Sequence, residues 1–308
     1  MRDKDFDMQL KQTECPVKVA EIVEKTIRAV YPHYYPSGAV QFFLDLHNER
    51  RIREALAREN IYFAEVQVEM MFIDDYKAYI SAETMMGPNS ARILAELLDK
   101  YPLQLVLDDT ILDLGCGTGL TSLIIAKETG AKVIANDLWI SAEENRKRFA
   151  AWGVGDQITP VCEDANHLPF EKEQFRALIS IDAYHYFAGS KGFFQEKILP
   201  FMKEDGVVLI GIPGLKDKYT GRAEELLSDW LGDDAGMFKS PKLWKELIGG
   251  SDQIESMNTW EMDCFDEAWD DWLATNNTFA LGDRQYFETI IQPYTCLVGI
   301  YVRLRRTL

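Results

Sequence analysis

The sequence has few histidines, no paired cysteines and no long apolar run. Its 308 residues include 4 His and 5 Cys, and the cysteines form neither a C-x-x-C pair nor a metal-like spacing with a histidine. Neither a disulfide framework nor a metal site is therefore expected. No apolar run approaches the roughly 18 residues that a membrane span needs, and the charged first residues have no apolar core behind them. These absences favour a soluble, cytoplasmic protein.

Basic residues are also scarce relative to acidic ones. The chain has 33 Lys and Arg against 50 Asp and Glu, which gives a net charge of -17. This balance argues against a groove that follows nucleic-acid phosphates and against binding to an anionic membrane. A small or cationic partner fits the charge better. The hydrophobic content of 47% supports a substantial core, in one large domain or in one domain with an appendage.

What the sequence does have is a glycine-rich turn, T-I-L-D-L-G-C-G-T-G-L, at residues 110–120. An apolar run typical of a buried parallel strand precedes three alternating glycines, and a helical pattern follows them. Glycine lets the backbone turn sharply and lets a ligand approach the main chain beside the positive end of a helix. Taken alone the turn is a weak signal, because an ordinary strand-to-helix turn has the same pattern.

Strands alternate with helices after this turn. Apolar strand runs are expected at residues 132–136, 158–161, 175–181 and 206–212, and further strands at 253–262 and 294–304. Such alternation predicts an α/β fold with a doubly wound, mostly parallel sheet.

Three short motifs carry a resemblance to a known family. They are D-L-G-C-G-T-G at residues 113–119, Asp137 after the next strand, and Asp164-Ala165 after the strand that follows. Together they resemble the first three binding motifs of class I S-adenosylmethionine-dependent methyltransferases, in particular small-molecule enzymes of the ubiquinone-biosynthesis and cyclopropane-synthase-like group. The resemblance covers residues 70–308. It implies a seven-stranded Rossmann-like sheet, S-adenosylmethionine as cofactor and methyl transfer to a small-molecule acceptor, by a domain at residues 69–308 with a substrate cover at about 215–292.

The resemblance also assigns the cofactor site. Asp113 and the glycine backbone would hold the ammonium of the cofactor's amino-acid end, and Asp137 would accept from the two ribose hydroxyls. Asp164 and the backbone N–H of Ala165 would bind the adenine. Asp137 and Asp164 could instead be helix N-caps. The cofactor-binding residues predicted in this way are Asp113, Gly115, Cys116, Gly117, Gly119, Asp137, Leu138, Trp139, Asp164, Ala165 and Ser180.

The catalytic prediction falls on residues 180–186, S-I-D-A-Y-H-Y, at the end of the fourth strand. This strand end is expected to face the methyl group and the acceptor. Methyl transfer is an in-line displacement that depends mainly on alignment, and it needs a base only when the nucleophile arrives protonated. His185 or the phenol of Tyr184 could take or orient that proton. The alternative for His185 is a packing role at the strand end.

Residues 264–274, C-F-D-E-A-W-D-D-W-L-A, place three aromatic residues at helical spacing beside four acids. Aromatic faces and carboxylates attract cations, so one interpretation is an amine acceptor. The commoner interpretation is a helix that packs its apolar face and leaves the acids in solvent.

Residues 1–68 differ from the rest of the chain. Their expected order of helix, helix and strand resembles the first third of a GNAT-type N-acetyltransferase, through V-E-K-T-I-R-A-V-Y-P-H-Y-Y-P-S-G-A-V and the strand I-Y-F-A-E-V. The acetyl-CoA loop of that family, Q/R-x-x-G-x-G/A, is absent, so acetyl transfer is not expected. We interpret the segment as an appended element that covers the next domain or mediates association, for example as a homodimer.

Two other functions stay open at this point. A nicotinamide dehydrogenase also uses a glycine turn, but with the spacing G-x-G-x-x-G and commonly with a Tyr-x-x-x-Lys pair, and the sequence has neither. A regulator that binds S-adenosylmethionine without catalysis is the second alternative. Nucleic-acid methylation is disfavoured by the acidity and by the lack of an N/D-P-P-Y motif. The identity of the acceptor is left open.

Overall fold

The structure is a computed structural model of the chain, and it describes residues 10–12, 62–64, 73–105 and 109–306. The chain divides into two compact units, Met1–Val68 and Glu69–Leu308. In the first unit the described residues form two antiparallel strands, β1 (Leu10–Gln12) and β2 (Tyr62–Ala64). The strand expected at 61–66 is thus present in part. The two helices expected before it, and most of the segment that resembles an acetyltransferase, lie outside the described residues.

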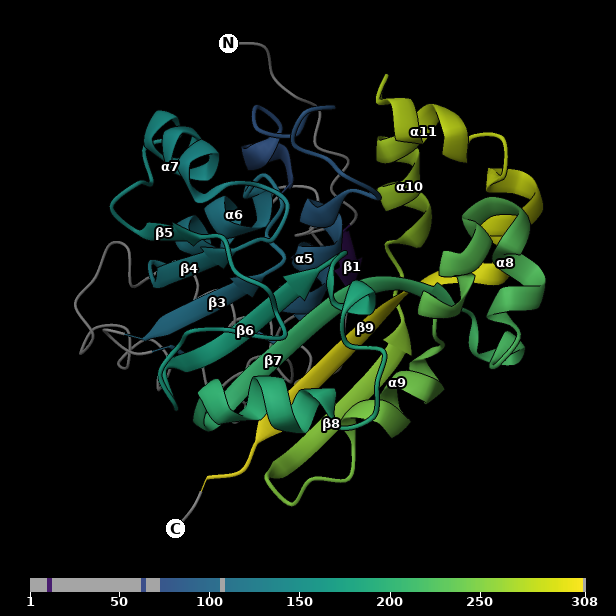
Figure 1. The fold of residues 1–308 in the computed structure, drawn as a ribbon. Helices are drawn as coiled ribbons and strands as arrows, with labels where there is room; N and C mark the ends of the chain where they lie inside the picture. Colours follow the sequence, from purple (N-terminus) through teal and green to yellow (C-terminus); the bar gives the residue numbers. More distant parts are fainter. Residues whose placement is uncertain (1–9, 13–61, 65–72, 106–108, 307–308) are drawn as a thin grey trace. The chain divides into compact units, whose positions relative to one another are not determined.

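The second unit is built on a seven-stranded sheet with the strand order β5-β4-β3-β6-β7-β9-β8 (Figure 1). The strands from β3 to β7 pair in parallel, and β9 pairs antiparallel with both β7 and β8. This topology confirms the predicted doubly wound, mostly parallel fold. The strands are β3 (Thr110–Leu114), β4 (Lys132–Asn136), β5 (Ile158–Val161), β6 (Phe175–Ile181), β7 (Met202–Leu215), β8 (Ile254–Glu261) and β9 (Thr295–Leu304).

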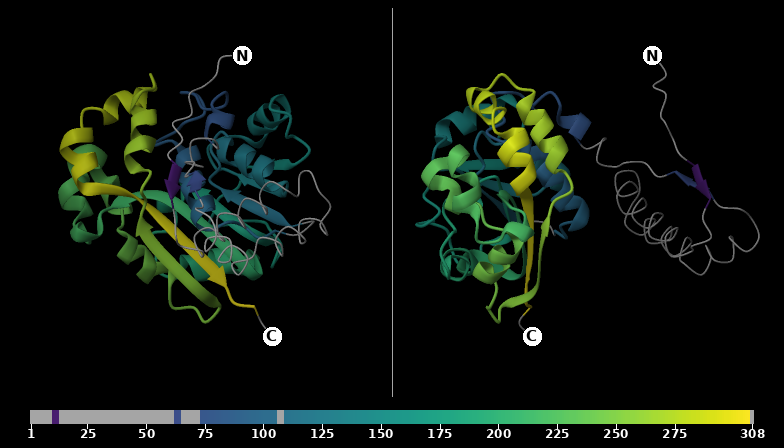
Figure 2. Two further views of the ribbon diagram at one scale, coloured as in Figure 1. Left: turned by 180° about the vertical axis from the view of Figure 1, so that it is seen from behind. Right: turned by 90° about the vertical axis from the view of Figure 1, so that its right-hand side faces the viewer.

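Helices cover both faces of this sheet (Figure 2). The α-helices are α5 (Ser90–Lys100), α6 (Leu120–Thr129), α7 (Ala142–Ala151), α8 (Ala223–Leu231), α9 (Pro241–Ile248), α10 (Phe265–Leu273), α11 (Thr278–Asp283) and α12 (Gln292–Tyr294). Shorter 3-10 and π-helical turns are η2 (Tyr184–Tyr186), η3 (Phe194–Ile198), η4 (Leu199–Phe201), η5 (Asp217–Tyr219), η6 (Gly232–Met237) and η7 (Phe287–Ile291). None of the described helices is both long and apolar enough to cross a membrane.

Two cores hold the layers together. On one face, α5 and α6 pack fully buried side chains such as Leu94 and Ile124 against the sheet. On the other face, η3 and α9 do the same with Phe194 and Trp244. Apolar residues removed from water in this way supply the main stabilising term of the fold. The arrangement leaves the ends of the strands free to carry loops.

The local starts of the helices follow from their capping residues. Asn89 caps α5, with its side-chain oxygen accepting from the N–H of Ala91 at 3.0 Å. Ser141 and Glu144 form a capping box at the start of α7, which satisfies two N–H groups that a helix leaves open. α6 instead begins after Gly119, which adopts a left-handed conformation with φ of 87°. α6 and α7 therefore each begin shortly after the strand before them, β3 and β4.

α10 confirms the commoner interpretation of the aromatic stripe. Trp269 and Trp272 are buried, and they pack with Ile291 in a small core of their own. α8, α10 and α11 lie together at one end of the sheet (Figure 1). We refer to these three helices as the cover. Its role towards a substrate stays a prediction.

Candidate active site

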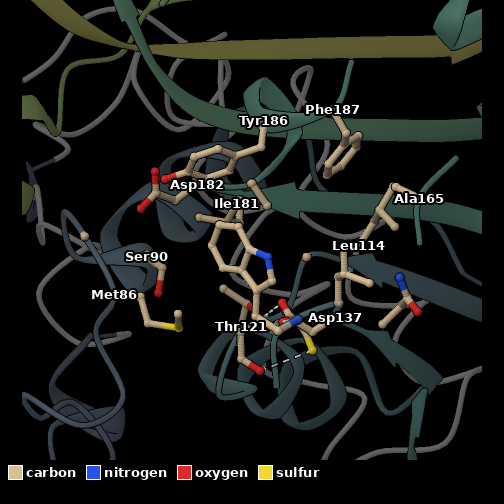
Figure 3. Close-up of a pocket in the computed structure, with 18 of the residues that line it drawn as sticks. Met86, Ser90, Leu114, Thr121, Asp137, Ala165, Ile181, Asp182, Tyr186 and Phe187 are labelled. Atoms are coloured by element: carbon tan, nitrogen blue, oxygen red, sulfur yellow. Dashed lines mark hydrogen bonds between the residues drawn. The ribbon is translucent and has the colours of Figure 1, made fainter. Parts of the chain in front are cut away.

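A cavity of about 360 Å³ lies at the carboxyl ends of the parallel strands (Figure 3). Its wall comes from the turns after four strands, at residues 114–117 after β3, 136–139 after β4, 163–166 after β5, and 181–183, 186 and 187 after β6. Residues 86–90, just before and at the start of α5, close another side. Open α/β sheets bind their ligands at this edge. The cavity therefore brings together turns that are far apart in the sequence.

The glycine turn is shaped by its lack of side chains. Gly115 and Gly117 have φ of 79° and 53°, in the left-handed region that glycine adopts without strain. A β carbon on Gly115 would stand 2.2 Å from Cβ of Ala183, and one on Gly117 would stand 2.9 Å from Sδ of Met86. Larger residues would thus collide with the opposite wall. The turn is a close cradle in which a ligand can lie against the backbone.

Two other residues of the turn have different environments. Cys116 is buried, lines the cavity and donates weakly to the carbonyl of Gly117. Gly119 does not line the cavity, and a β carbon there would stand 2.3 Å from the ring of Phe149 in the core. Of the three predicted glycines, the first two line the cavity and the third allows close packing of the helix.

Asp137 ties the glycine turn to the turn after β4. Its Oδ2 accepts from the N–H of Gly117 at 2.8 Å, and its Oδ1 accepts from the N–H groups of Trp139 and Ile140. Ser141, not Asp137, caps the following helix. The carboxylate also lines the cavity, and its oxygens have further lone pairs for ligand hydroxyls. Asp137 therefore does not act as the N-cap that the sequence left open.

An exposed apolar wall stands beside Asp137. The side chains of Leu138 and Trp139 are 57% and 65% exposed, and both line the cavity. Such exposure is costly for large apolar groups unless something covers them. The wall suits a flat aromatic ring, which would remove it from water.

Asp164 and Ala165 line the cavity from the turn after β5. Oδ1 of Asp164 accepts from the backbone N–H of Asn166 at 2.8 Å and from its side-chain amide at 2.9 Å. These hydrogen bonds hold the pKa of the Asp164 carboxyl below its usual range. No helix follows within residues 165–174, all of which the structure describes, so Asp164 is not a helix cap either.

Asp113 lies under the glycine turn and does not line the cavity. It is fully buried, and its Oδ2 accepts from the hydroxyls of Thr121 at 2.7 Å and Ser122 at 2.6 Å. Its Oδ1 has no hydrogen-bond partner in the described part of the chain. Burial raises the pKa of Asp113 to about 6, although the two hydroxyls oppose the shift. Because Thr121 itself lines the cavity, Asp113 is separated from a ligand by one hydroxyl group.

Ser180 has a structural position. It is fully buried, and its hydroxyl donates to the carbonyl of Leu114 at 2.7 Å, which joins β6 to the end of β3. It does not line the cavity. Ser180, like Asp113 and Gly119, is thus outside the wall that the other predicted cofactor-binding residues form.

The structure also does not bring Tyr184 and His185 to the cavity. Tyr184 is 1% exposed and packs against Phe187, Phe193 and Trp244, and burial raises the pKa of its phenol above the usual range. His185 is 4% exposed, and burial with the charge of Lys239 lowers its pKa to about 3. Successive side chains of a 3-10 turn point about 120° apart. The two residues turn into the protein, and a neutral His185 is a poor base.

The turn after β6 instead presents Asp182 and Tyr186 to the cavity (Figure 3). Asp182 has φ of 54°, a conformation that Asp and Asn tolerate better than most residues and that is often found at functional sites. Burial and the charge of Asp283 raise its pKa to about 8. Burial and nearby carboxylates, Asp182 foremost, raise the pKa of Tyr186 to about 12. In the sequence, the feature that could have identified Asp182 as a site residue is its position directly after a central strand, β6.

Comparison with known proteins agrees with this geometry. Residues 111–206 match the family model of a methyltransferase domain. The sterol 24-C-methyltransferase of Yarrowia lipolytica is 28% identical over 139 residues, which are 45% of this chain and 36% of that protein. The aligned part thus spans about a third of the length of this relative.

Solved structures share the fold over most of the second unit. The geranyl diphosphate C-methyltransferase of Streptomyces coelicolor A3(2), in complex with Mg²⁺, geranyl diphosphate and S-adenosyl-L-homocysteine, gives a TM-score of 0.57 at 12% identity, over 79% of this chain and 99% of that one. The phosphoethanolamine N-methyltransferase 2 of Haemonchus contortus, in complex with S-adenosyl-L-methionine, gives a TM-score of 0.56 at 19% identity, over 80% of this chain and 62% of that one. At these identities the likeness shows the fold. Residues 111–206 thus match a methyltransferase domain, and the second unit has the Rossmann-like fold of these methyltransferase structures.

Proposed function

We propose that the protein transfers a methyl group from S-adenosylmethionine to the nitrogen of a small-molecule amine. The observation that carries the proposal is a single cavity with two chemically different ends. One end has the glycine cradle with Asp137, and the other has Asp182 with Tyr186, and the rings of Trp139 and Tyr186 meet between them with their centroids 5.3 Å apart. When bound, the cofactor supplies a methyl group activated by a sulfonium.

The first end fits this cofactor. Gly115 and Gly117 leave room against the backbone, and Asp137 offers acceptors for the ribose hydroxyls. The exposed wall of Leu138 and Trp139 suits adenine. Asp113, with its unpartnered oxygen, adds negative charge below the turn, where the ammonium of the amino-acid end would be favoured.

The second end fits an amine. Asp182 supplies a carboxyl group that becomes a carboxylate as the pH rises through its pKa of about 8, and the rings of Tyr186 and Phe187 stand beside it in the wall. Carboxylates and aromatic faces both attract cations. Among the described residues that line the cavity, none is Lys or Arg, so the wall offers no positive side chain to a phosphate or carboxylate on the acceptor. The net charge of -17 acts in the same direction.

The chain's contribution to the reaction is mainly one of position. Alignment of two bound reactants can lower a barrier by roughly 7–11 kcal/mol. The two ends of the cavity would place donor and acceptor side by side at the end of β6, away from bulk water. A base is needed only to free the nitrogen lone pair.

A two-step experiment tests the proposal. Calorimetry first measures the binding of S-adenosylmethionine and of NADH to the full chain, and we expect binding of the former only. Formation of S-adenosylhomocysteine is then followed over a panel of amines, thiols, phenols and carboxylates. Turnover confined to amines is the expected result. Binding without turnover of any acceptor would point to a regulator, and turnover of another class would overturn the amine assignment.

A further inference from the structure

We propose that Asp182 accepts the proton that an amine acceptor must lose before it is methylated. The inference rests on the proposed function, because it takes the acceptor to be an amine. It assigns the base to a residue other than His185 or Tyr184.

Asp182 is held in one place by the backbone around it. Its N–H donates to the carbonyl of Gly211 in β7 at 2.7 Å, and its backbone is in the left-handed region with φ of 54°. Its carboxylate lies so close to Gly87 that a β carbon there would stand 2.1 Å from Oδ2. The acid thus sits between β7 and the segment before α5, at the side of the cavity.

The carboxylate of Asp182 is available to a ligand. Within the described ranges, no hydrogen bond or ion pair joins it to another side chain. The side chain is partly exposed, and it lines the same cavity as the cofactor motifs. A cationic amine nitrogen in the cavity would supply the missing donor.

Asp283 supplies the negative charge that acts on Asp182. Its two oxygens accept from the indole N–H groups of Trp230 and Trp272, each at 2.9 Å. These donors come from α8 and α10, so the acid joins all three helices of the cover. The two hydrogen bonds orient the carboxyl group of Asp283.

The other charged groups near this turn do not cancel that effect. Asp283, Asp182 and the exposed Asp234 all act on Tyr186 in the same direction. Lys239 acts on His185, on the buried side of the turn. Burial and Asp283 are therefore what raise the pKa of Asp182 to about 8.

This environment suits the proton transfer. An alkylamine has a pKa near ~10 and binds as an ammonium, whose nitrogen pair is held in an N–H bond. The N–H bond breaks as its proton moves to an oxygen of Asp182, where an O–H bond forms. The electron pair of the broken bond stays on the nitrogen, which can then attack the methyl group. A base is most effective when its pKa is close to the operating pH. An ordinary Asp, with a pKa near ~3.9, would be a much weaker base.

A titration tests the inference without an acceptor. The full chain, labelled with ¹³C at the Asp carboxyl groups and saturated with S-adenosylhomocysteine, is followed by NMR from pH 5 to 10. One carboxyl should titrate near pH 8 and be absent from Asp182→Asn. Asp283→Asn should lower that midpoint, and Asp270→Asn, which removes an exposed acid from α10, should not. A midpoint near pH 4 for Asp182 would overturn the inference.

Kinetics with an amine from the acceptor panel complete the test. Asn keeps the size of Asp and tolerates the left-handed backbone, so Asp182→Asn should fold and bind S-adenosylhomocysteine within about threefold of the wild type. Its kcat should fall by about 10²–10⁴-fold. An unchanged kcat would overturn the role of Asp182 and leave methyl transfer to amines standing. A wild type that methylates no amine would instead defeat the proposed function and the base with it.

Discussion

The carboxylate of Asp182 lies directly against the α carbon of Gly87. A β carbon on residue 87 would stand 2.1 Å from Oδ2 of Asp182, so the absence of a side chain in one segment sets the position of an acid in another. The two residues are 95 positions apart in the sequence. Both line the cavity, and the acid after β6 can reach its place only because residue 87 is glycine.

Gly87→Ala should therefore disturb the acceptor end. The backbone at Gly87 is outside the left-handed region, so alanine meets only the carboxylate. We expect at least a tenfold lower turnover with the amine acceptor and a loss of about 1–3 kcal/mol in the free energy of unfolding, as for other overpacked sites. Gly282→Ala, where a β carbon meets nothing within 4 Å, is the matched control and should change neither. Steady-state kinetics and urea unfolding measure both, and full activity of Gly87→Ala would contradict the contact.

Asp182 should make stability depend on pH. Its pKa is raised from 3.8 to about 8 in the folded protein, so its contribution to stability is complete below about pH 4 and is lost as the pH rises to about 8. Asp182→Asn lacks this dependence. Since one pKa unit corresponds to about 1.4 kcal/mol, the variant should gain about 2 kcal/mol or more over the wild type between pH 5 and 8.5. Calorimetric unfolding at both pH values measures this gain, and a constant difference would refute it.

Asp113 should support cofactor binding through its charge. Asp113→Asn keeps the shape and one acceptor for Thr121 or Ser122, and we expect the Kd for S-adenosylmethionine to rise by about tenfold, as for the loss of one charge-assisted interaction. The same Kd should rise in the wild type as the pH falls from 7 to 5, because the pKa of Asp113 is about 6. Isothermal calorimetry at several pH values gives both numbers. Equal Kd values for variant and wild type would show that the charge does not reach the cofactor.

Ser180, in contrast to Asp113, should contribute to stability and not to cofactor binding. Ser180→Ala removes the hydrogen bond to the carbonyl of Leu114 and should cost about 1 kcal/mol of stability. The Kd for S-adenosylhomocysteine should stay within about twofold. A large loss of affinity without a loss of stability would instead support the cofactor role that the sequence predicted for this residue.

The fold could be predicted largely because buried parallel strands and their helices have distinct periodicities. The bounds of β4, β5 and β6 agree with the expected apolar runs at 132–136, 158–161 and 175–181. β7 begins four residues before the expected start at 206, at Met202. Polar residues interrupt its apolar pattern there, and Asp205 is held by Arg176 and Arg303 from two neighbouring strands. Such pairings join distant segments, and a local pattern does not contain them.

The site could be predicted only to the level of its turns. Residues 115–117 of the glycine turn and the acids after β4 and β5 line the cavity, because strand ends fix where turns stand, whereas Asp113 and Gly119 of the same motif do not. The inward direction of Tyr184 depends on packing against Trp244 and Phe193, which come from other elements. The sequence favoured His185 as the base because histidine ordinarily titrates near neutral pH. In the structure burial lowers the pKa of His185 to about 3 and raises that of Asp182 to about 8.

Methyl transfer to an amine nitrogen can be tested directly with S-adenosylmethionine labelled with ¹³C in its methyl group. The full chain is incubated with the amine panel, and products are resolved by NMR and mass spectrometry. We predict a labelled methyl group on the nitrogen of an amine, together with an equal amount of S-adenosylhomocysteine. Label on oxygen, sulfur or carbon, or no transfer by a protein that binds the cofactor, would contradict it.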